Sequence, residues 1–399
     1  MPVSAYLFPW DVDGDPAAAE RIAGLGVTEV SLAAAYHAVR AVTPFHPEQR
    51  IVTRDAAVYY RPDPGRWRGA LLRPPEPDGD AAGSFERAAD ALHAAGLRVN
   101  AWIVVAHNGR LAAAHPDCAV RNAYGDVYPW ALCIGAPEVA AYAATLAAEI
   151  AALDGVDEVE LEACGWYGYD HGSAHDKAGG PPAGAPGWLL DACFCAACTG
   201  ALRDVGVDPG TAAQRIRAAL DAAYEGGGFA QPTPARAEEL GEPAGAVPTA
   251  RAAAAGAFLH RVLAAVRDAA PGRDVLVHAD PDPLAAGANP GYDPAVLLGP
   301  DGADGMIVAC PGPVTHAEEI VRRTKSKVRS GRRIAATLPA VTALGAITGD
   351  LPSKTRAVLA AGATDLRLYH AGLASAADHA AMREVTKIAG RMPRPSGRG

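Results

Sequence analysis

Acidic side chains alternate with apolar ones in the segment 156–164, which reads VDEVELEAC. Successive side chains of a strand point to opposite faces, so Glu160 and Glu162 share one face. Ionised carboxylates in an apolar interior cost several kcal/mol unless other groups pair with them. We expect Glu162, nearer the end of the strand, to be catalytic and Glu160 to support it. The structural alternative is an ion-pair network with bases such as Arg98 or Arg367.

A second acid follows the segment 274–279, where the chain reads DVLVHADPDP. By the same alternation His278 and Asp280 share a face, and we expect both to point inward beside Glu162. Two acids on neighbouring strand ends can hydrolyse a glycoside, since one attacks or activates water and the other protonates the leaving oxygen. The alternative is that Asp280 and Asp282, each before a proline, initiate turns.

Aromatic and hydrogen-bonding side chains end several other predicted strands. Trp and Tyr offer flat surfaces for the C–H face of a sugar, and His and Asn can bind hydroxyl groups. One such residue is more often a packing residue, so only their accumulation predicts a polyol site. The residues that we expect to bind substrate are Trp10, His37, His107, Asn108, Glu160, Trp166, His278 and Tyr369.

Three cysteines within one short run, Cys193, Cys195 and Cys198, form a metal-binding pattern. Three thiolates at this spacing suit a tetrahedral structural zinc site that needs one more ligand. Since no second CxxC pair is present, three free buried cysteines are the alternative. We place the fourth ligand at Cys133, and Cys118, Cys164 and His175 are the alternatives.

Two histidines spaced four residues apart, His171 and His175, allow a different metal site. On one helix face they could bind a divalent ion, but the glycine between them favours a loop, and no HExxH frame is present. Together, Glu160, Glu162, His278 and His175 would suit a metal-dependent barrel hydrolase or isomerase.

Apolar, β-branched runs alternate with Ala-rich stretches along the chain, which is typical of parallel strands joined by crossover helices. Glycines after several helical stretches supply the left-handed cap that returns the chain to the sheet. An open doubly wound sheet is the alternative, but the first strand–helix turn has no GxGxxG or P-loop. The pattern predicts an α/β fold, a (β/α)₈ TIM barrel. Its strands are predicted at 3–8, 28–34, 98–106, 156–164, 274–279, 305–309, 332–338 and 365–369.

The chain has 399 residues, whereas a minimal barrel needs about 250. We place the surplus in insertions at 36–83, after the second strand, and 165–250, after the fourth. Both follow strands, so they belong to the C-terminal rim, where barrel enzymes build their sites. We expect a single domain over 1–391 and a disordered tail over 392–399.

The composition argues against several classes of protein. The net charge is −9, with 36 Lys and Arg against 45 Asp and Glu, and no dense basic block suggests binding to nucleic acid or anionic membranes. No signal sequence is evident, and no stretch approaches the roughly 18 apolar residues that a membrane span needs. Seven cysteines, clustered and odd in number, do not suggest a disulfide framework. We expect a cytoplasmic protein.

Several motifs between 97 and 200 resemble a known family. They are HPD at 115–117, RNAYGD at 121–126, YPWALC at 128–133, the ELE strand and the CFCAAC run. The segment resembles uncharacterised glycoside-hydrolase-like TIM-barrel proteins of bacteria, in which this strand commonly reads GVDGIxLD, and this implies that Glu162 is the nucleophile. The cysteine run is similar to the zinc loop of some bacterial β-galactosidases, where an earlier cysteine completes the site.

The chain departs from that family directly after the strand. Where relatives often carry Asp-Tyr-x-Arg-Tyr-Pro, this chain has ACGWY at 163–167, so the resemblance supplies no proton donor. The residues together predict a glycosidase acting on a carbohydrate or glycoside, with Glu162 as nucleophile or base and Asp280 as acid. Neighbouring strands would place the two carboxyl groups near the roughly 5 Å of retaining enzymes. No organic cofactor is expected, and a non-catalytic sugar-binding barrel is the alternative.

Overall fold

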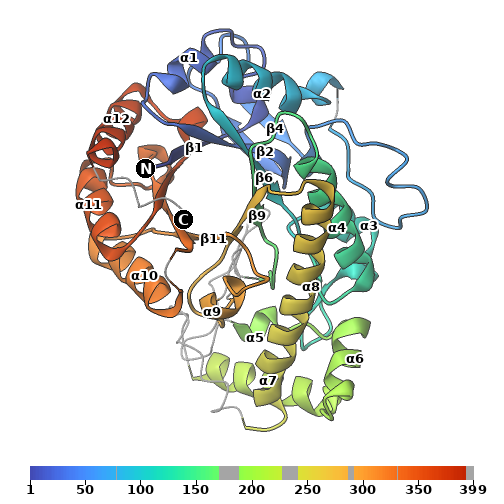
Figure 1. The fold of residues 1–399 in the computed structure, drawn as a ribbon. Coiled ribbons are helices and arrows are strands. Elements are labelled where there is room, and N and C mark those ends of the chain that lie inside the picture. The colour runs from blue at the N-terminus through green and yellow to red at the C-terminus, as the bar shows by residue number, and fades with distance from the viewer. Residues whose placement is uncertain (78, 170–187, 227–240, 286–291, 330, 392–399) are drawn as a thin grey trace.

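A computed structural model describes residues 1–77, 79–169, 188–226, 241–285, 292–329 and 331–391 (Figure 1). Eight parallel strands form a closed barrel, because β1 pairs with both β2 and β13. The predicted (β/α)₈ fold is confirmed, and the strands begin and end within two residues of the predicted positions. In order around the barrel they are β1 (Val3–Leu7), β2 (Glu29–Tyr36), β6 (Arg98–Val104), β9 (Glu158–Glu162), β10 (Asp274–His278), β11 (Gly305–Ala309), β12 (Arg333–Pro339) and β13 (Asp365–Tyr369).

Helices between the strands surround the barrel (Figure 1). One of them, α4, shows why the Ala-rich stretches become helical. Pro137 occupies its first turn, and Val139, Tyr142, Leu146 and Ile150 are buried at helical spacing, while alanines between them allow close packing. These outer helices are α1 (Ala18–Ala23), α2 (Ser84–Ala94), α4 (Pro137–Ala151), α8 (Val247–Ala269), α9 (Pro294–Leu297), α10 (Val314–Lys327), α11 (Leu351–Ala361) and α12 (Ala376–Gly390). Among the described residues, no helix is both long and apolar enough to cross a membrane.

Three segments extend the rim, of which the sequence predicted two. After β2, an antiparallel hairpin of β3 (Val39–Val42) and β4 (Ile51–Arg54) precedes β5 (Ala57–Val58), which pairs with β2. After β9, the chain forms α5 (Trp188–Asp191), α6 (Ala196–Asp204) and α7 (Pro209–Glu225), which share a small apolar core of their own. The unpredicted segment follows β6 and carries α3 (Gly109–Ala114) and a hairpin of β7 (Ala119–Arg121) and β8 (Val127–Leu132).

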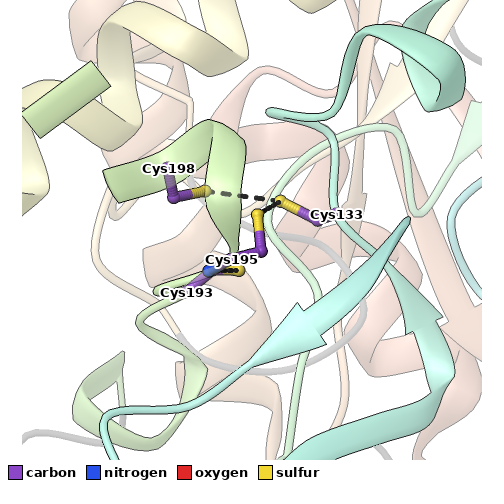
Figure 2. Close-up of side chains that lie close together, drawn as sticks. All are labelled: Cys133, Cys193, Cys195 and Cys198. Atoms are coloured by element: carbon purple, nitrogen blue, oxygen red, sulfur yellow. Dashed lines mark hydrogen bonds between the residues drawn. The ribbon is translucent and has the colours of Figure 1, made fainter. Parts of the chain in front are cut away.

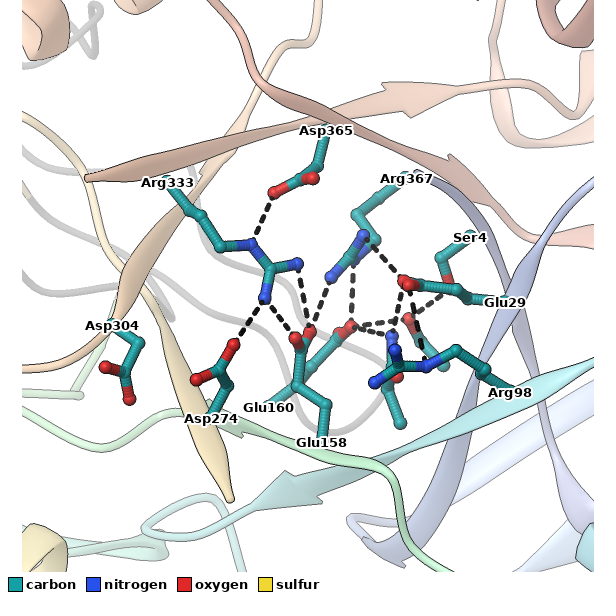
Figure 3. Close-up of polar contacts among 12 residues, drawn as sticks. Ser4, Glu29, Arg98, Glu158, Glu160, Asp274, Asp304, Arg333, Asp365 and Arg367 are labelled. Atoms are coloured by element: carbon teal, nitrogen blue, oxygen red, sulfur yellow. Dashed lines mark hydrogen bonds and ion pairs between the residues drawn. The ribbon is translucent and has the colours of Figure 1, made fainter. Parts of the chain in front are cut away.

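The lower half of the barrel interior is polar, as the alternating acids of β9 predict (Figure 3). Arg367 is fully buried, and its guanidinium donates to Glu160 Oε1 at 2.8 Å and to Glu158 Oε1 at 2.9 Å. Arg333 joins Glu158 to Asp365. The predicted partner Arg367 is therefore confirmed. The other predicted base, Arg98, lies 4.0 Å from Glu29 instead.

Candidate active site

A cavity of about 190 Å³ opens above this polar layer, at the carboxyl ends of the strands. Its position is the one at which TIM-barrel enzymes bind their substrates. Residues from seven strands line it, so residues far apart in the sequence become neighbours. The lining residues that carry polar groups or aromatic rings are Tyr6, Trp102, Glu162, His278, Thr337 and Tyr369.

Glu162 is the carboxylate that lines this cavity. It is the last residue of β9 and is half-buried, and its Oε2 accepts a hydrogen bond from Trp102 Nε1 at 2.6 Å. Trp102 lies on the neighbouring strand β6, and its ring packs edge-on against Tyr6 with centroids 4.7 Å apart. The indole therefore fixes one carboxylate oxygen of Glu162 through a short, charge-assisted hydrogen bond. The inward orientation that the strand alternation predicted is confirmed.

Glu160 lies one layer deeper and is fully buried. Burial alone would raise the pKa of Glu160, but the Arg367 guanidinium, together with His278 and the Ser31 hydroxyl at 2.7 Å, lowers it to about 2. Glu160 therefore stays ionised and occupied by its own partners. It does not line the cavity, and its position supports the residues above it rather than a substrate.

His278 connects the two layers. Its Nε2 lies 3.2 Å from the Tyr6 hydroxyl oxygen and 3.8 Å from Glu160 Oε2, and its side chain lines the cavity. Burial, with the nearby Glu160 charge, holds the pKa of Tyr6 well above its ordinary value. Tyr6 therefore keeps its hydroxyl proton and can donate it in a hydrogen bond at the cavity floor.

Asp280 follows β10 but does not line the cavity that holds Glu162. Its Oδ1 accepts a hydrogen bond from the Asp282 backbone N–H at 2.8 Å, and Asp282 in turn accepts one from Leu284 N at 3.0 Å. Both aspartates therefore stabilise turns, as the alternative interpretation expected. Burial raises the pKa of Asp280 above its ordinary value.

The remaining predicted substrate residues separate into different places. Of these, Tyr369 lines the cavity with Glu162. His37 and His107 stack on each other with centroids 4.1 Å apart, and Asn108 caps α3 by accepting from Leu111 N at 3.0 Å. Trp10 lines a different cavity, and Trp166 packs beside the cysteine cluster, while His171 and His175 lie outside the described residues.

Two aromatic residues of the cavity, Tyr6 and Trp102, were not predicted. Both lie on strands that were correctly placed, and both follow the period-2 alternation that pointed to Glu162. Applying the alternation to VSAYL and RVNAWIV would have placed Tyr6 and Trp102 on the inward face with Ser4 and Asn100. The same period-2 alternation therefore predicts the inward orientation of both rings.

Four cysteines form a compact buried cluster, as the sequence predicted (Figure 2). Cys133 Sγ lies 3.4 Å from Cys198 Sγ and 3.6 Å from Cys195 Sγ, and Cys193 completes the group within 4.8 Å. Cys133 comes from the loop after β8, Cys193 and Cys195 directly precede α6, and Cys198 lies in its first turn. Elsewhere in the described part of the chain, no other group of His, Cys, Asp or Glu is close enough to hold a metal ion.

The surroundings of this cluster suit thiolates. The backbone N–H groups of Arg121 and Cys195 each lie 3.4 Å from Cys193 Sγ, and such donors stabilise charged sulfur. Arg251 is positioned over the Trp166 ring at 4.8 Å, where its positive charge faces the cluster. At Gly135, a Cβ atom would lie 3.1 Å from Cys198 Sγ, so a larger residue there would require the sulfur to shift.

No protein-family model matches this sequence, and no curated protein sequence matches it. Solved structures do match its fold. The PgaB (BpsB) glycoside hydrolase domain of Bordetella bronchiseptica has a TM-score of 0.60 at 16% identity, covering 97% of this chain and 99% of that one. The α-L-fucosidase isoenzyme 2 of Paenibacillus thiaminolyticus has a TM-score of 0.58 at 12% identity, covering 98% and 49%.

A β-galactosidase from the haloarchaeon Halorubrum lacusprofundi is similar at the same level, with a TM-score of 0.57 and 12% identity over 98% of this chain and 58% of that one. The chain thus spans about half of the fucosidase and nearly all of the Bordetella domain. At these identities the likeness concerns the fold. The chain has a TIM-barrel fold of the kind found in glycoside hydrolases.

Proposed function

We propose that this protein is a glycoside hydrolase that uses Glu162 as its nucleophile or general base. The observation that supports this most strongly is a half-buried carboxylate at the end of β9, oriented by Trp102 in a cavity lined by aromatic rings. Oxygen-rich, partly apolar sugars suit such a lining, because Tyr6 and Tyr369 offer ring faces and His278 offers a hydrogen-bonding nitrogen. The fold likeness to glycoside hydrolases supports the same class.

For the proton donor we propose Asp280. It follows the strand next to Glu162, and burial raises its pKa above the ordinary value, which is the direction that favours a proton donor. Its carboxylate is now held in a turn, so reaching a leaving oxygen requires the 280–284 turn to move towards the cavity. The metal-dependent alternative gains no support, since Glu160 is occupied by Arg367.

We also propose that the four cysteines bind a structural zinc ion. Their number, burial and mutual distances fit a tetrahedral site with four thiolate ligands, which leaves no open position for catalysis. Such an ion would tie α6, in the segment after β9, to the loop that follows β8. Zinc would thus stabilise the rim beside the active site without entering the reaction.

A panel of aryl glycosides tests whether the protein is an enzyme or a sugar-binding barrel. We expect the purified protein to hydrolyse at least one glycoside, and the corresponding free sugar to raise its melting temperature. Turnover is measured by release of the phenol, with heat-denatured protein as control. If a free sugar raises the melting temperature but no aryl glycoside in the panel is hydrolysed, the protein is a non-catalytic sugar-binding barrel instead.

A further inference from the structure

His278 lies beside Glu162 on the neighbouring strand, and both side chains line the same cavity. The register of β10 with β9 pairs Val277 with Leu161, so His278 and Glu162 occupy the next level together. Residues at one level of neighbouring parallel strands share a face, and the strands lie about 4.8 Å apart. His278 is therefore placed to contact the same sugar ring as Glu162.

The Nε2 atom of His278 faces the polar layer below the cavity. It lies 3.8 Å from Glu160 Oε2 and 3.2 Å from the Tyr6 hydroxyl oxygen. The other oxygen of Glu160 accepts from Arg367 and Ser31, and the ion pair with Arg367 keeps the carboxylate charged. An Nε2 lone pair would face this negative charge, whereas an Nε2–H bond is attracted to it. Glu160 therefore favours the tautomer with the proton on Nε2.

The second ring nitrogen, Nδ1, is open to the cavity. No described residue hydrogen-bonds it, and it is not one of the unpartnered polar atoms that the described protein encloses. The His278 side chain is 8% exposed, whereas Tyr6 and Glu160 below it are completely buried. With the proton on Nε2, Nδ1 carries a lone pair and can only accept a hydrogen bond. The cavity thus presents an imidazole acceptor beside the Glu162 carboxylate.

A sugar ring can supply a donor to this acceptor next to the reacting carbon. In the proposed reaction the Glu162 carboxylate acts at the anomeric carbon, whose ring neighbours are the ring oxygen and C2. The ring oxygen carries no hydrogen, so the hydroxyl closest to the reaction centre is the 2-hydroxyl. Because His278 is level with Glu162, this hydroxyl is the donor within reach of Nδ1. Hydrogen bonds to the 2-hydroxyl strengthen in the transition state of glycoside hydrolysis.

We propose that His278, with its proton held on Nε2 by Glu160, accepts a hydrogen bond through Nδ1 from the 2-hydroxyl of the sugar. The proposal rests on the function proposed for Glu162 and adds the part of the substrate that the site selects. Glycosides with a free 2-hydroxyl should be preferred over 2-deoxy glycosides, because the missing donor leaves Nδ1 without a partner. His278 is then a specificity-determining residue, and Glu160 is a positioning residue that acts through it.

The preference is measured as the kcat/KM of an aryl glycoside divided by the kcat/KM of its 2-deoxy form. Comparing this ratio between protein variants cancels the different intrinsic reactivity of the two substrates. His278→Gln keeps an amide donor near the position of Nε2 but has no acceptor at the position of Nδ1. The ratio should therefore fall at least about tenfold in His278→Gln. An unchanged ratio would overturn the proposal, while hydrolysis itself would still support the function proposed for Glu162.

Two further variants separate this role from packing. His278→Asn places its amide oxygen near the position of Nδ1, so it should keep most of the ratio. His260→Gln changes an exposed histidine of α8 and should give the ratio of the unmodified protein. A loss in His278→Asn as large as that in His278→Gln would show that the ring only packs, and would overturn the proposal.

Nitrogen-15 NMR of histidine-labelled protein tests the tautomer without any turnover. The signals of His278 are assigned by their absence in His278→Gln and are compared at high pH, where they no longer change with pH. We expect the proton on Nε2 in the unmodified protein and a smaller Nε2–H fraction in Glu160→Gln. A proton on Nδ1 in the unmodified protein would overturn the proposal, and an unchanged tautomer in Glu160→Gln would remove Glu160 from it.

Sugar binding separates failure of this proposal from failure of the proposed hydrolysis. If a free sugar binds but no glycoside is hydrolysed, the glycosidase function fails. The affinity of that sugar is then compared with the affinity of its 2-deoxy form in the same variants. A 2-deoxy penalty that is about tenfold smaller in His278→Gln would support the contact to the 2-hydroxyl, and an equal penalty would overturn it. Absence of both turnover and sugar binding would overturn both proposals.

Discussion

At the scale of single residues, Asp280 combines a raised pKa with a place next to the strand of Glu162. If it protonates the leaving oxygen, Asp280→Asn should slow hydrolysis of glycosides with poor leaving groups by about 10²–10⁴, the usual contribution of general acid catalysis. Aryl glycosides with acidic phenols do not need their leaving oxygen protonated, so Asp280→Asn should hydrolyse them at nearly the rate of the unmodified protein. The measurement is kcat/KM plotted against the pKa of the leaving phenol.

The control for this prediction is Asp282→Asn, which alters the neighbouring aspartate of the same turn. In Asp282→Asn, kcat/KM should depend on the pKa of the leaving phenol as it does in the unmodified protein. If Asp280→Asn gives the same slope as the unmodified enzyme, Asp280 is not the proton donor.

His370 supplies a pH prediction at the same scale. It is fully buried against Phe8, and burial lowers its pKa to about 3. In the unfolded chain the pKa of a histidine is near 6.5. Between pH 6.5 and 3 the unfolded state therefore binds one more proton, so this contribution to stability is present above pH 6.5 and lost as the pH falls. Buried Asp11, with its pKa raised to about 7, acts with the opposite sign.

The His370 contribution is isolated by comparing the protein with His370→Gln. Between pH 4 and 6 the difference in unfolding free energy should change by about 1.4 kcal/mol per pH unit, with the original protein losing stability faster towards acid. Urea unfolding at several pH values gives this slope. Parallel curves for the two proteins would show that His370 titrates normally in the folded state.

At the scale of structural elements, the cysteine cluster should join α6 to the loop after β8 through zinc. Cys195→Ser removes one of four ligands, so bound zinc should fall from one per chain to well below one, and α6 should unfold more easily. Elemental analysis and hydrogen exchange over Ala196–Asp204 measure the two effects. The matched control is Cys118→Ser, a buried cysteine outside the cluster, which should keep its zinc.

A zinc content near zero in the unmodified protein, purified without chelators, would contradict this account of the cluster. Loss of zinc in Cys118→Ser would instead indicate a different ligand set.

The elements themselves were predictable to different degrees. Buried parallel strands such as β11, with the sequence GMIVA, combine apolar runs with flanking loops, and this signal placed them correctly. The hairpin of β7 and β8 was not predicted. Its sequence includes RNAYGDVYPW, in which turn-forming and charged residues interrupt the apolar pattern of two short strands. Short antiparallel strands depend on such pairing more than on local preference.

The candidate site was predictable only where a charge interrupted an apolar pattern. Glu162 and His278 stood out for this reason and both line the cavity. Trp102 did not stand out, because an aromatic residue in a strand is usually a packing residue. Only the structure shows that its indole N–H donates to Glu162. Asp280 was linked to Glu162 by strand order and by side-chain alternation, and neither determines the path of the turn that follows β10.

At the scale of the whole molecule, the barrel interior has a layer of ion pairs and, above it, the cavity that Glu162 lines. An ion-pair layer around Arg367 fills the lower interior, and the cavity with Glu162 lies above it, while the rim segments carry the cysteine cluster (Figures 2 and 3). This arrangement places a layer of paired charges below Glu162, the carboxylate proposed to react. Nearly the whole chain shares this barrel fold with a glycoside hydrolase domain.

The role of Glu162 is tested most directly by the turnover of an aryl glycoside by Glu162→Gln, with Glu384→Gln, an exposed position on α12, as control. Glutamine keeps the size and one hydrogen-bond acceptor for Trp102, so the fold should persist while the charge is lost. We predict that kcat falls by at least about 10³ in Glu162→Gln, with an unchanged melting temperature, and stays the same in the control. Hydrolysis by Glu162→Gln at the original rate would contradict the assignment of Glu162 to the reaction.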